Sequence, residues 1–270
     1  MLSLGLGYRA LVIGSTGTIG AGFVAALKQD PNCSLVVEVS RRDMPGFALE
    51  DEASLAAAAT QCAASGPFQL IVDATGALTI DGKGPEKHLG ALDATRLMRS
   101  FQVNAIGPAL LLKYFLPLLA RERVIYAKLS ARVGSISDNA KGGWYGYRAS
   151  KAAVNMLLQT AAIEFARKNP QAILVALQPG TVASPLSQPF SQDCFKLCDK
   201  CQKFSQFRLN LVTLKTCEAA KLHRKDRLSL NLRETKLFHE SCLCVFTRLA
   251  CADEFDHFVD VFWHVRVFVA

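Results

Sequence analysis

Short apolar runs alternate with longer amphipathic stretches over the first two thirds of the chain. The apolar runs are rich in aliphatic and β-branched residues and end at glycine, proline or polar residues, which is typical of buried strands. The predicted strands are Tyr8–Ile13, Leu35–Val39, Leu70–Val72, Val124–Leu129 and Ile173–Leu177.

The stretches between these runs have the hydrophobic period of helices. Helices are predicted after Gly20 as far as Lys28, over Ser54–Cys62 with Asp51 or Ser54 as its cap, over about Leu89–Leu119 with a bend near Gly107-Pro108, and over Tyr147–Lys168. Strands that alternate with helices and have continuous apolar cores require a parallel sheet that is covered on both faces. The predicted fold class is therefore α/β, a Rossmann-type doubly wound parallel sheet.

The composition changes near residue 190. All 18 glycines lie at or before Gly180, and seven of the nine cysteines lie at or after Cys194. Tight turns and helix ends usually draw on glycine. We therefore divide the chain into a dinucleotide-binding catalytic core, residues 1–190, and an atypical Cys-rich, Gly-free tail, residues 191–270, which we expect to be poorly ordered. A shifted reading frame or a retained non-coding stretch is our hypothesis for its origin.

Charge and hydropathy restrict the possible partners. The net charge is +8, and Lys196–Lys236 holds eleven Lys or Arg but only four acids. A patch for nucleic acid or membrane surfaces is one interpretation; we favour a poorly folded basic segment and expect neither partner. No apolar stretch reaches the roughly 20 residues of a membrane span, and a signal peptide would include the first strand. We therefore expect a cytoplasmic protein.

Cysteines of the tail offer one metal hypothesis. Cys194, Cys198 and Cys201 could bind zinc together with Cys217 or His223, but no second paired knuckle follows. We favour chance clustering and predict no metal.

A glycine-rich turn follows the first strand and opens the first helix. Small residues there allow the backbone to approach a pyrophosphate, whose charge the helix N-terminus favours. We expect this turn to bind the cofactor through Gly14, Ser15, Thr16, Gly17, Thr18, Ile19 and Gly20.

The end of the second strand distinguishes the two nicotinamide cofactors. An acidic residue there would bind the ribose 2′-hydroxyl, whereas a basic residue accommodates the 2′-phosphate. Glu38 lies inside the strand, and Ser40, Arg41 and Arg42 follow it. Because guanidinium groups suit phosphate, these residues favour NADP; a solvated basic loop is the alternative.

The strongest chemical signal is the pair Tyr147 and Lys151. Residues four apart share one face of a helix, so the phenol and the ammonium can address one ligand. A free tyrosine has a pKa near 10, and we expect the neighbouring cation to lower it. The tyrosine can then exchange a proton with a substrate oxygen while hydride moves to or from the nicotinamide.

These residues resemble the short-chain dehydrogenase/reductase family, and within it the C-factor-like and sniffer-type carbonyl reductases. The resemblance covers the first 190 residues. The matching segments are Gly14–Gly20, Asp73-Ala74-Thr75-Gly76, Val103-Asn104-Ala105-Ile106-Gly107, Ser130-Ala131-Arg132-Val133-Gly134-Ser135, Tyr147–Lys151 and Pro179-Gly180-Thr181-Val182.

The resemblance implies roles for further residues. It implies a proton relay through Asn104 and Lys151, with Tyr147 as general acid and a serine that orients the substrate carbonyl. Ala131 stands at the usual serine position, so Ser130 or Ser135 must serve, and we favour Ser130. It also implies cofactor contacts from Ala74, Thr75, Gly76, Pro179, Gly180 and Val182, with Ser184 where the family often has threonine.

The sequence thus predicts an NADP-dependent oxidoreductase that transfers hydride between the nicotinamide and a small carbonyl or alcohol substrate. One alternative is a non-catalytic nucleotide-binding signalling protein, and another is an inactive product with an aberrant C-terminus. The glycine spacing of three and three also suggests an epimerase, but a sugar-nucleotide domain is not evident. Assembly into homo-oligomers stays open. Apolar residues alternate over residues 257–269, a pattern that is typical of an edge strand.

Overall fold

The computed structural model describes residues 4–179, 182, 184 and 266–268. Within this part of the chain, one sheet has the strand order β2-β1-β3-β4-β5-β6. The first five strands are parallel, and β6 is antiparallel to β5. The strands are β1 Tyr8–Ile13, β2 Cys33–Val39, β3 Leu70–Asp73, β4 Val124–Leu129, β5 Ala172–Leu177 and β6 Arg266–Phe268.

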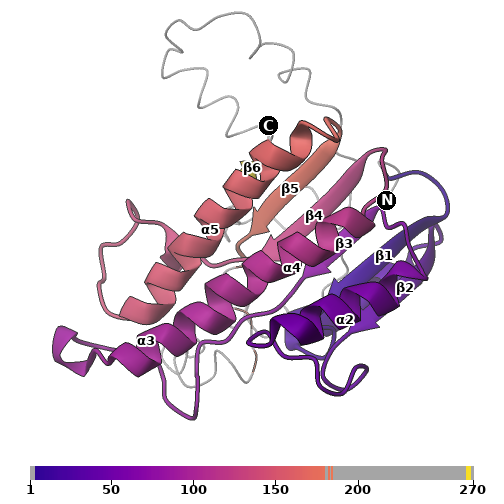
Figure 1. Ribbon diagram of the computed structural model, residues 1–270. Helices are drawn as coiled ribbons and strands as arrows, with labels where there is room; N and C mark the ends of the chain where they lie inside the picture. The colour runs from indigo at the N-terminus through magenta and orange to yellow at the C-terminus, as the bar shows by residue number, and fades with distance from the viewer. Residues whose placement is uncertain (1–3, 180–181, 183, 185–265, 269–270) are drawn as a thin grey trace, which may run out of the picture.

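Helices connect the parallel strands and cover both faces of the sheet, one of which faces the viewer in Figure 1. Helices α2, α4 and α5 pack on one face, and α1 packs on the other. The helices are α1 Thr18–Gln29, α2 Glu52–Ala63, α3 Ala94–Phe101, α4 Gly107–Phe115 and α5 Tyr145–Ala166. The predicted doubly wound α/β fold is confirmed.

The two cores explain why the strands read as continuous apolar runs. Leu11 and Ile13 of β1 belong to the core under α2, α4 and α5. Ala10 and Val12 point to the opposite face and pack with Phe23, Val24 and Leu27 of α1. Because successive strand side chains alternate between faces and both faces are buried, every position of β1 except Arg9 is buried.

The predicted helical region over about Leu89–Leu119 is confirmed from Ala94 to Leu118, but it is not one regular α-helix. The structure divides it into a 3₁₀ turn Leu89–Ala91, α3, a π-helix Gln102–Ile106, α4 and a 3₁₀ turn Leu116–Leu118. Pro108 lacks the N–H that an α-helix interior needs, and the Gly107 N–H donates to Gln102 O, five residues back. The irregularity therefore lies directly before the predicted bend and holds Asn104.

The two proposed caps of α2 are resolved. The Asp51 carboxylate accepts a hydrogen bond from Ala53 N at 3.0 Å, whereas Ser54 Oγ donates to Ala48 O and Asp51 O. Asp51 is therefore the N-cap, in the role that short acidic residues commonly fill.

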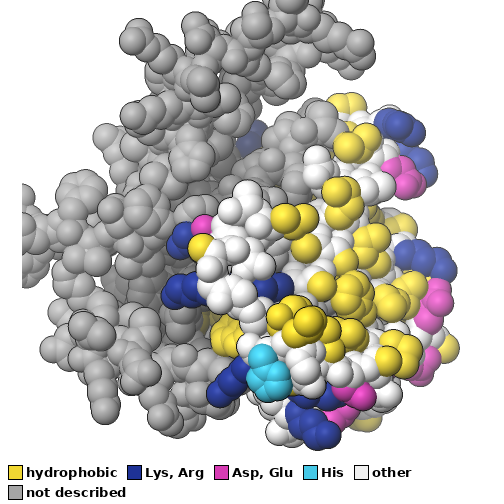
Figure 2. All heavy atoms as spheres, turned by 90° about the vertical axis from the view of Figure 1, so that its left-hand side faces the viewer, with side chains coloured by type: hydrophobic (Ala, Val, Ile, Leu, Met, Phe, Trp, Pro, Cys, Tyr) yellow, Lys and Arg dark blue, Asp and Glu magenta, His cyan; other side chains and the backbone are white. Residues whose placement is uncertain are grey.

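Exposed apolar side chains gather over α3, α5 and the segments beside them. Figure 2 shows this side of the molecule, where hydrophobic side chains form a broad patch between charged groups. The exposed large hydrophobic residues in and beside these helices include Leu89, Leu92, Met98, Ile106, Tyr145, Met156, Leu157 and Ile163. None of the helices within the described residues combines the length and the apolar character that a membrane span needs.

Candidate active site

The candidate site lies at the carboxyl ends of β1, β3 and β4. The strand order reverses between β1 and β3, and open α/β sheets bind ligands in the crevice outside such a point. The Gly14–Gly20 turn, the Asp73–Gly76 turn and the Ser130 region follow these three strands. The fold therefore brings the predicted motifs to one edge of the sheet.

The glycine-rich turn has no room for a side chain at Gly20. A Cβ atom there would lie 2.1 Å from Gly14 O, and Gly14 itself has φ +80°. The turn leads into α1, whose first turn carries no acidic residue. A helix N-terminus free of negative charge behind a bare backbone loop is suited to a pyrophosphate group, so these residues fit a dinucleotide.

At the other end of the turn, an acidic residue joins two buried hydroxyl groups. Asp43 Oδ2 accepts hydrogen bonds from Ser15 Oγ at 3.1 Å and from Ser40 Oγ at 2.6 Å. The bond from Ser40 lowers the pKa of the Asp43 carboxyl, and Arg42 contributes to the same shift. The structure thus brings the predicted cofactor residues Ser15 and Ser40 together around a carboxylate that the sequence analysis did not single out.

The two arginines predicted to bind a 2′-phosphate have different surroundings. Arg42 Nε donates to Asp43 Oδ1 at 2.9 Å, and Arg42 Nη2 lies 3.5 Å from Glu38 Oε2. Arg41 is exposed and has no ion pair with any residue that the structure describes. A phosphate could therefore bind the Arg41 guanidinium without competing with a carboxylate.

Two of the predicted catalytic residues, Asn104 and Lys151, converge on Gly76 in the turn after β3. A Cβ atom on Gly76 would lie 3.1 Å from Lys151 Nζ and 3.2 Å from Asn104 Oδ1, and its φ is +140°. Asn104 is fully buried in the π-helix, and its side chain exchanges two hydrogen bonds with the Ala77 backbone, at 2.9 and 2.8 Å. π-Helical segments occur often at functional sites. Residues 76, 104 and 151 thus meet at one point.

Lys151 and Tyr147 lie on one face of α5, as predicted, with Lys151 Nζ 5.6 Å from the centre of the Tyr147 ring. Burial, together with the nearby Lys128 cation, lowers the pKa of Lys151 to about 7. Burial raises the pKa of Tyr147 to about 12. The predicted lowering of this pKa is therefore wrong for the structure described, because removal from water outweighs the cation above the ring.

A buried ion pair couples β3 to β4 beside these residues. Lys128 Nζ donates to Asp73 Oδ1 at 2.9 Å and to Thr75 O at 2.8 Å, and the two charged side chains are 2% and 0% exposed. Asp73 Oδ1 also accepts from Thr75 N and Thr75 Oγ1, at 2.9 and 2.6 Å. The pair therefore fixes the turn that leads from Asp73 to Gly76.

Both candidate serines are buried, in different surroundings. Ser130 Oγ donates to Asn155 Oδ1 at 2.6 Å, whereas Ser135 Oγ lies 3.3 Å from Ser137 Oγ. Asn155 is one helical turn beyond Lys151, and its buried Nδ2 has no acceptor among the described residues. The choice of Ser130 stays a prediction.

Some predicted positions follow β5 or lie farther along the chain. Pro179, Val182 and Ser184 belong to the described residues, whereas Gly180 lies outside them. The basic segment and all the proposed metal ligands of the tail also lie outside them, namely Cys194, Cys198, Cys201, Cys217 and His223.

Three residues near the site were not singled out from the sequence: Asp43, Lys128 and Asn155. A signal existed for Lys128, because it is the one charged residue in the apolar strand Val124–Leu129. Asn155 continues the helical face of Tyr147 and Lys151 by four residues. Asp43 gave no signal, since an acid in a surface loop is ordinary.

Comparison with known proteins places these residues in a family. Residues 9–194 match the family described as short chain dehydrogenase. The chain is 30% identical over 147 residues to 1-hydroxy-2-glutathionyl-2-methyl-3-butene dehydrogenase of Rhodococcus sp., which covers 54% of this chain and 61% of that protein. It is 36% identical over 105 residues to C-signal of Myxococcus xanthus, which covers 37% of this chain and 60% of that protein. The chain thus spans about three fifths of these relatives.

Solved structures support the fold. The NADPH-bound carbonyl reductase from chicken fatty liver has a TM-score of 0.58 at 23% identity, over 68% of this chain and 80% of that chain. The carbonyl reductase Sniffer of D. melanogaster has a TM-score of 0.56 at 20% identity, over 67% of this chain and 83% of that chain. At these identities the likeness establishes a shared fold.

Proposed function

The chain belongs to the short-chain dehydrogenase family, and from this premise we propose that it is an NADPH-dependent reductase of small carbonyl compounds. The observation that carries the proposal is the convergence of Lys151 and Asn104 on Gly76, beside Tyr147, at the switch point of the sheet. The relative from Rhodococcus is a dehydrogenase by name, and the chicken structure is a carbonyl reductase with bound NADPH. Both support the same reaction class.

The cofactor is assigned to residues that fit its two ends. The turn residues 14–20 would hold the pyrophosphate, and Ser40, Arg41 and Arg42 would face the 2′-phosphate. Ala74, Thr75 and Gly76, with Pro179, Gly180 and Val182, would border the nicotinamide. When bound, the nicotinamide supplies the hydride.

Tyr147 acts as the proton donor in this proposal. With its pKa raised to about 12, the phenol is protonated at neutral pH and can give its proton to a carbonyl oxygen. The carbonyl carbon gains a hydride and the oxygen gains this proton, so that C=O becomes CH–OH. A protonated phenol favours reduction over the reverse reaction, which needs a proton acceptor.

Lys151 and Asn104 serve the tyrosine. Lys151, with its pKa near 7, is partly protonated at neutral pH and can return a proton to Tyr147. The Asn104 side chain bonds to the backbone N–H and C=O of Ala77 and so fixes the Gly76-Ala77 turn beside Lys151 Nζ. Ser130 is assigned to orient the substrate carbonyl.

The experiment is NADPH oxidation, followed by absorbance, with a panel of aldehydes, quinones and diketones. We expect turnover in the wild type and a loss of activity of about 10²–10⁴-fold in Tyr147→Phe, because a positioned proton donor usually contributes a rate factor of that size. The control is Tyr145→Phe, because Tyr145 is exposed at the start of α5. No wild-type turnover, or equal rates in Tyr147→Phe, would contradict the proposal.

A second candidate is a nucleotide-binding signalling protein without turnover. The similarity to C-signal of Myxococcus xanthus favours it. It predicts tight NADPH binding, measured by cofactor fluorescence, together with no oxidation of NADPH by any carbonyl compound in the panel.

A further inference from the structure

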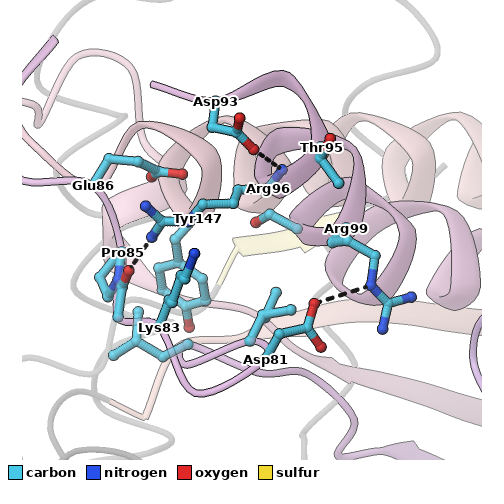
Figure 3. Close-up of a pocket in the computed structure, with 13 residues that line it drawn as sticks. Asp81, Lys83, Pro85, Glu86, Asp93, Thr95, Arg96, Arg99 and Tyr147 are labelled. Carbon is cyan, nitrogen blue, oxygen red and sulfur yellow. Dashed lines mark hydrogen bonds and ion pairs between the residues drawn. The ribbon is translucent and has the colours of Figure 1, made fainter. Parts of the chain in front are cut away.

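A pocket beside Tyr147 has a charge pattern that the reaction chemistry does not require. The pocket has a volume of about 200 Å³ and lies between the segment Leu78–Glu86, the start of α3 and Tyr147 (Figure 3). Three basic and three acidic side chains line it: Lys83, Arg96, Arg99, Asp81, Glu86 and Asp93. These formal charges sum to zero, so the local electrostatic potential depends on which of the six groups already have partners.

The three acids are all engaged. Glu86 is 5% exposed and accepts a hydrogen bond from Gly146 N at 3.0 Å, in the first turn of α5. Asp93 caps α3 by accepting from Arg96 N at 2.9 Å. Helix N-termini compensate negative charge in both places. Asp81 faces Arg99.

The three cations are not equally engaged. Arg99 is 3.5 Å from Asp81 and 3.2 Å from Glu50, so two carboxylates share it. Arg96 donates from Nη2 to Gly84 O and has no carboxylate partner for its guanidinium among the described residues. Lys83 has neither an ion pair nor a side-chain hydrogen bond within the described part of the chain. Lys83 and Arg96 therefore leave uncompensated positive charge in the pocket.

A tight turn fixes the backbone of Lys83. Ile80 and Lys83 exchange two backbone hydrogen bonds of 3.0 Å, and the two residues between them, Asp81 and Gly82, have φ +51° and +73°. Asp-Gly with both φ values positive is the preferred sequence of a two-residue hairpin turn. Lys83 is thus presented at the pocket by local structure and not by a freely moving loop.

We propose that the substrate is an aldehyde or ketone that also carries a carboxylate, which Lys83 and Arg96 bind while the carbonyl group faces Tyr147. The proposal rests on the reductase function proposed above. A planar guanidinium matches a carboxylate with two parallel N–H groups, and an ammonium adds a point charge. The carboxylate takes no part in the reaction. It lowers KM by holding the carbonyl group at the tyrosine.

The test compares two aldehydes with the same aromatic frame, of which one is negatively charged and the other is neutral. These are 4-formylbenzoate and its neutral methyl ester, each reduced by the full chain with NADPH. We expect kcat/KM to be about tenfold higher for the carboxylate, since hydrogen bonds to charged groups exceed neutral ones. Lys83→Met should remove most of this preference, because it should raise KM for the carboxylate much more than KM for the ester. Lys87→Met is the matched control, because this exposed lysine does not line the pocket.

Binding gives a readout without turnover. Benzoate should bind the NADP-loaded protein more tightly than benzamide in calorimetry, and Lys83→Met should weaken benzoate binding alone. Equal kcat/KM for acid and ester, or equal losses for both in Lys83→Met, would overturn the carboxylate assignment and leave the reductase intact. Absence of turnover with every aldehyde, while benzoate binding still depends on Lys83, would overturn the reductase instead.

Discussion

The two ends of the crevice place their charges in opposite surroundings. At the end assigned to catalysis, Asp73 and Lys128 are 0% and 2% exposed, and their polar atoms bond to each other, to Thr75 and to Tyr126. At the end assigned to the 2′-phosphate, the side chain of Arg42 is 66% exposed and shared by two carboxylates. Buried charges cost much to leave unpaired, whereas exposed pairs contribute at most about 1 kcal/mol. Substitutions at the first end should therefore be strongly destabilising. Substitutions at the second end should instead change the selectivity between NADPH and NADH.

The largest effect is expected from Asp73→Asn. It leaves the buried Lys128 ammonium without its counter-charge, which costs about 3–5 kcal/mol in comparable pairs. For a chain of this size, that loss lowers the melting temperature by roughly 6–20 °C. Thermal denaturation of the purified variant measures it.

The double variant Asp73→Asn with Lys128→Met separates charge from shape. Replacement of a whole buried pair is often close to neutral, so the double variant should recover much of the stability. If it were as unstable as the sum of the two single variants, the ion pair would not be the source of the loss.

The second prediction uses the pH dependence of stability. The pKa of Lys151 is lowered to about 7 in the folded chain, from an unfolded value near 10.5. Between these values the unfolded chain binds the extra proton, so stability rises as pH rises, by at most about 1.4 kcal/mol per pH unit. Below about pH 7 both states are charged and the cost of burial is complete.

Lys151→Met removes this titration. Between pH 7 and 9.5, the melting temperature of the wild type should therefore rise relative to that of the variant. Below pH 6.5, the difference between the two melting temperatures should be constant. Parallel curves over the whole range would show that Lys151 keeps its proton in the folded chain.

The third prediction concerns the glycine turn that connects the two ends. Gly20→Ala places a Cβ atom 2.1 Å from Gly14 O, so the turn must shift. Such overpacking costs about 1–3 kcal/mol, and NADPH affinity, measured by fluorescence titration, should fall with it. Gly22→Ala is the matched control in the same helix, because a Cβ atom there meets nothing within 4 Å and alanine favours a helix. Equal affinities in the two variants would contradict the assignment of the turn to the pyrophosphate.

The sequence predicts the strands within two residues because apolar runs between turn residues carry the signal locally. The Tyr147 and Lys151 pair is also local, since one helical turn joins the two residues. The partnerships of Lys128 with Asp73, 55 positions away, and of Gly76 with Asn104 and Lys151 exist only after the sheet has formed. The sign of the Tyr147 pKa shift was missed for the same reason, since burial is set by distant segments.

The smallest effect is expected at the exposed end. Asp43 holds Ser15, Ser40 and Arg42, and its negative charge lies among the groups assigned to the 2′-phosphate. Asp43→Asn removes that charge and releases Arg42, so KM for NADPH should fall relative to KM for NADH. The change should be fivefold or less, because an exposed pair contributes about 0.2–1 kcal/mol. Arg41→Ala should shift the same ratio in the opposite direction, and both shifts should shrink as salt is raised, since screening weakens exposed charges.

If Asp43→Asn instead lowered the affinity for both cofactors equally, the carboxylate would serve to hold Ser15 and Ser40 in place. The contrast between a structural end and a selective end would then disappear.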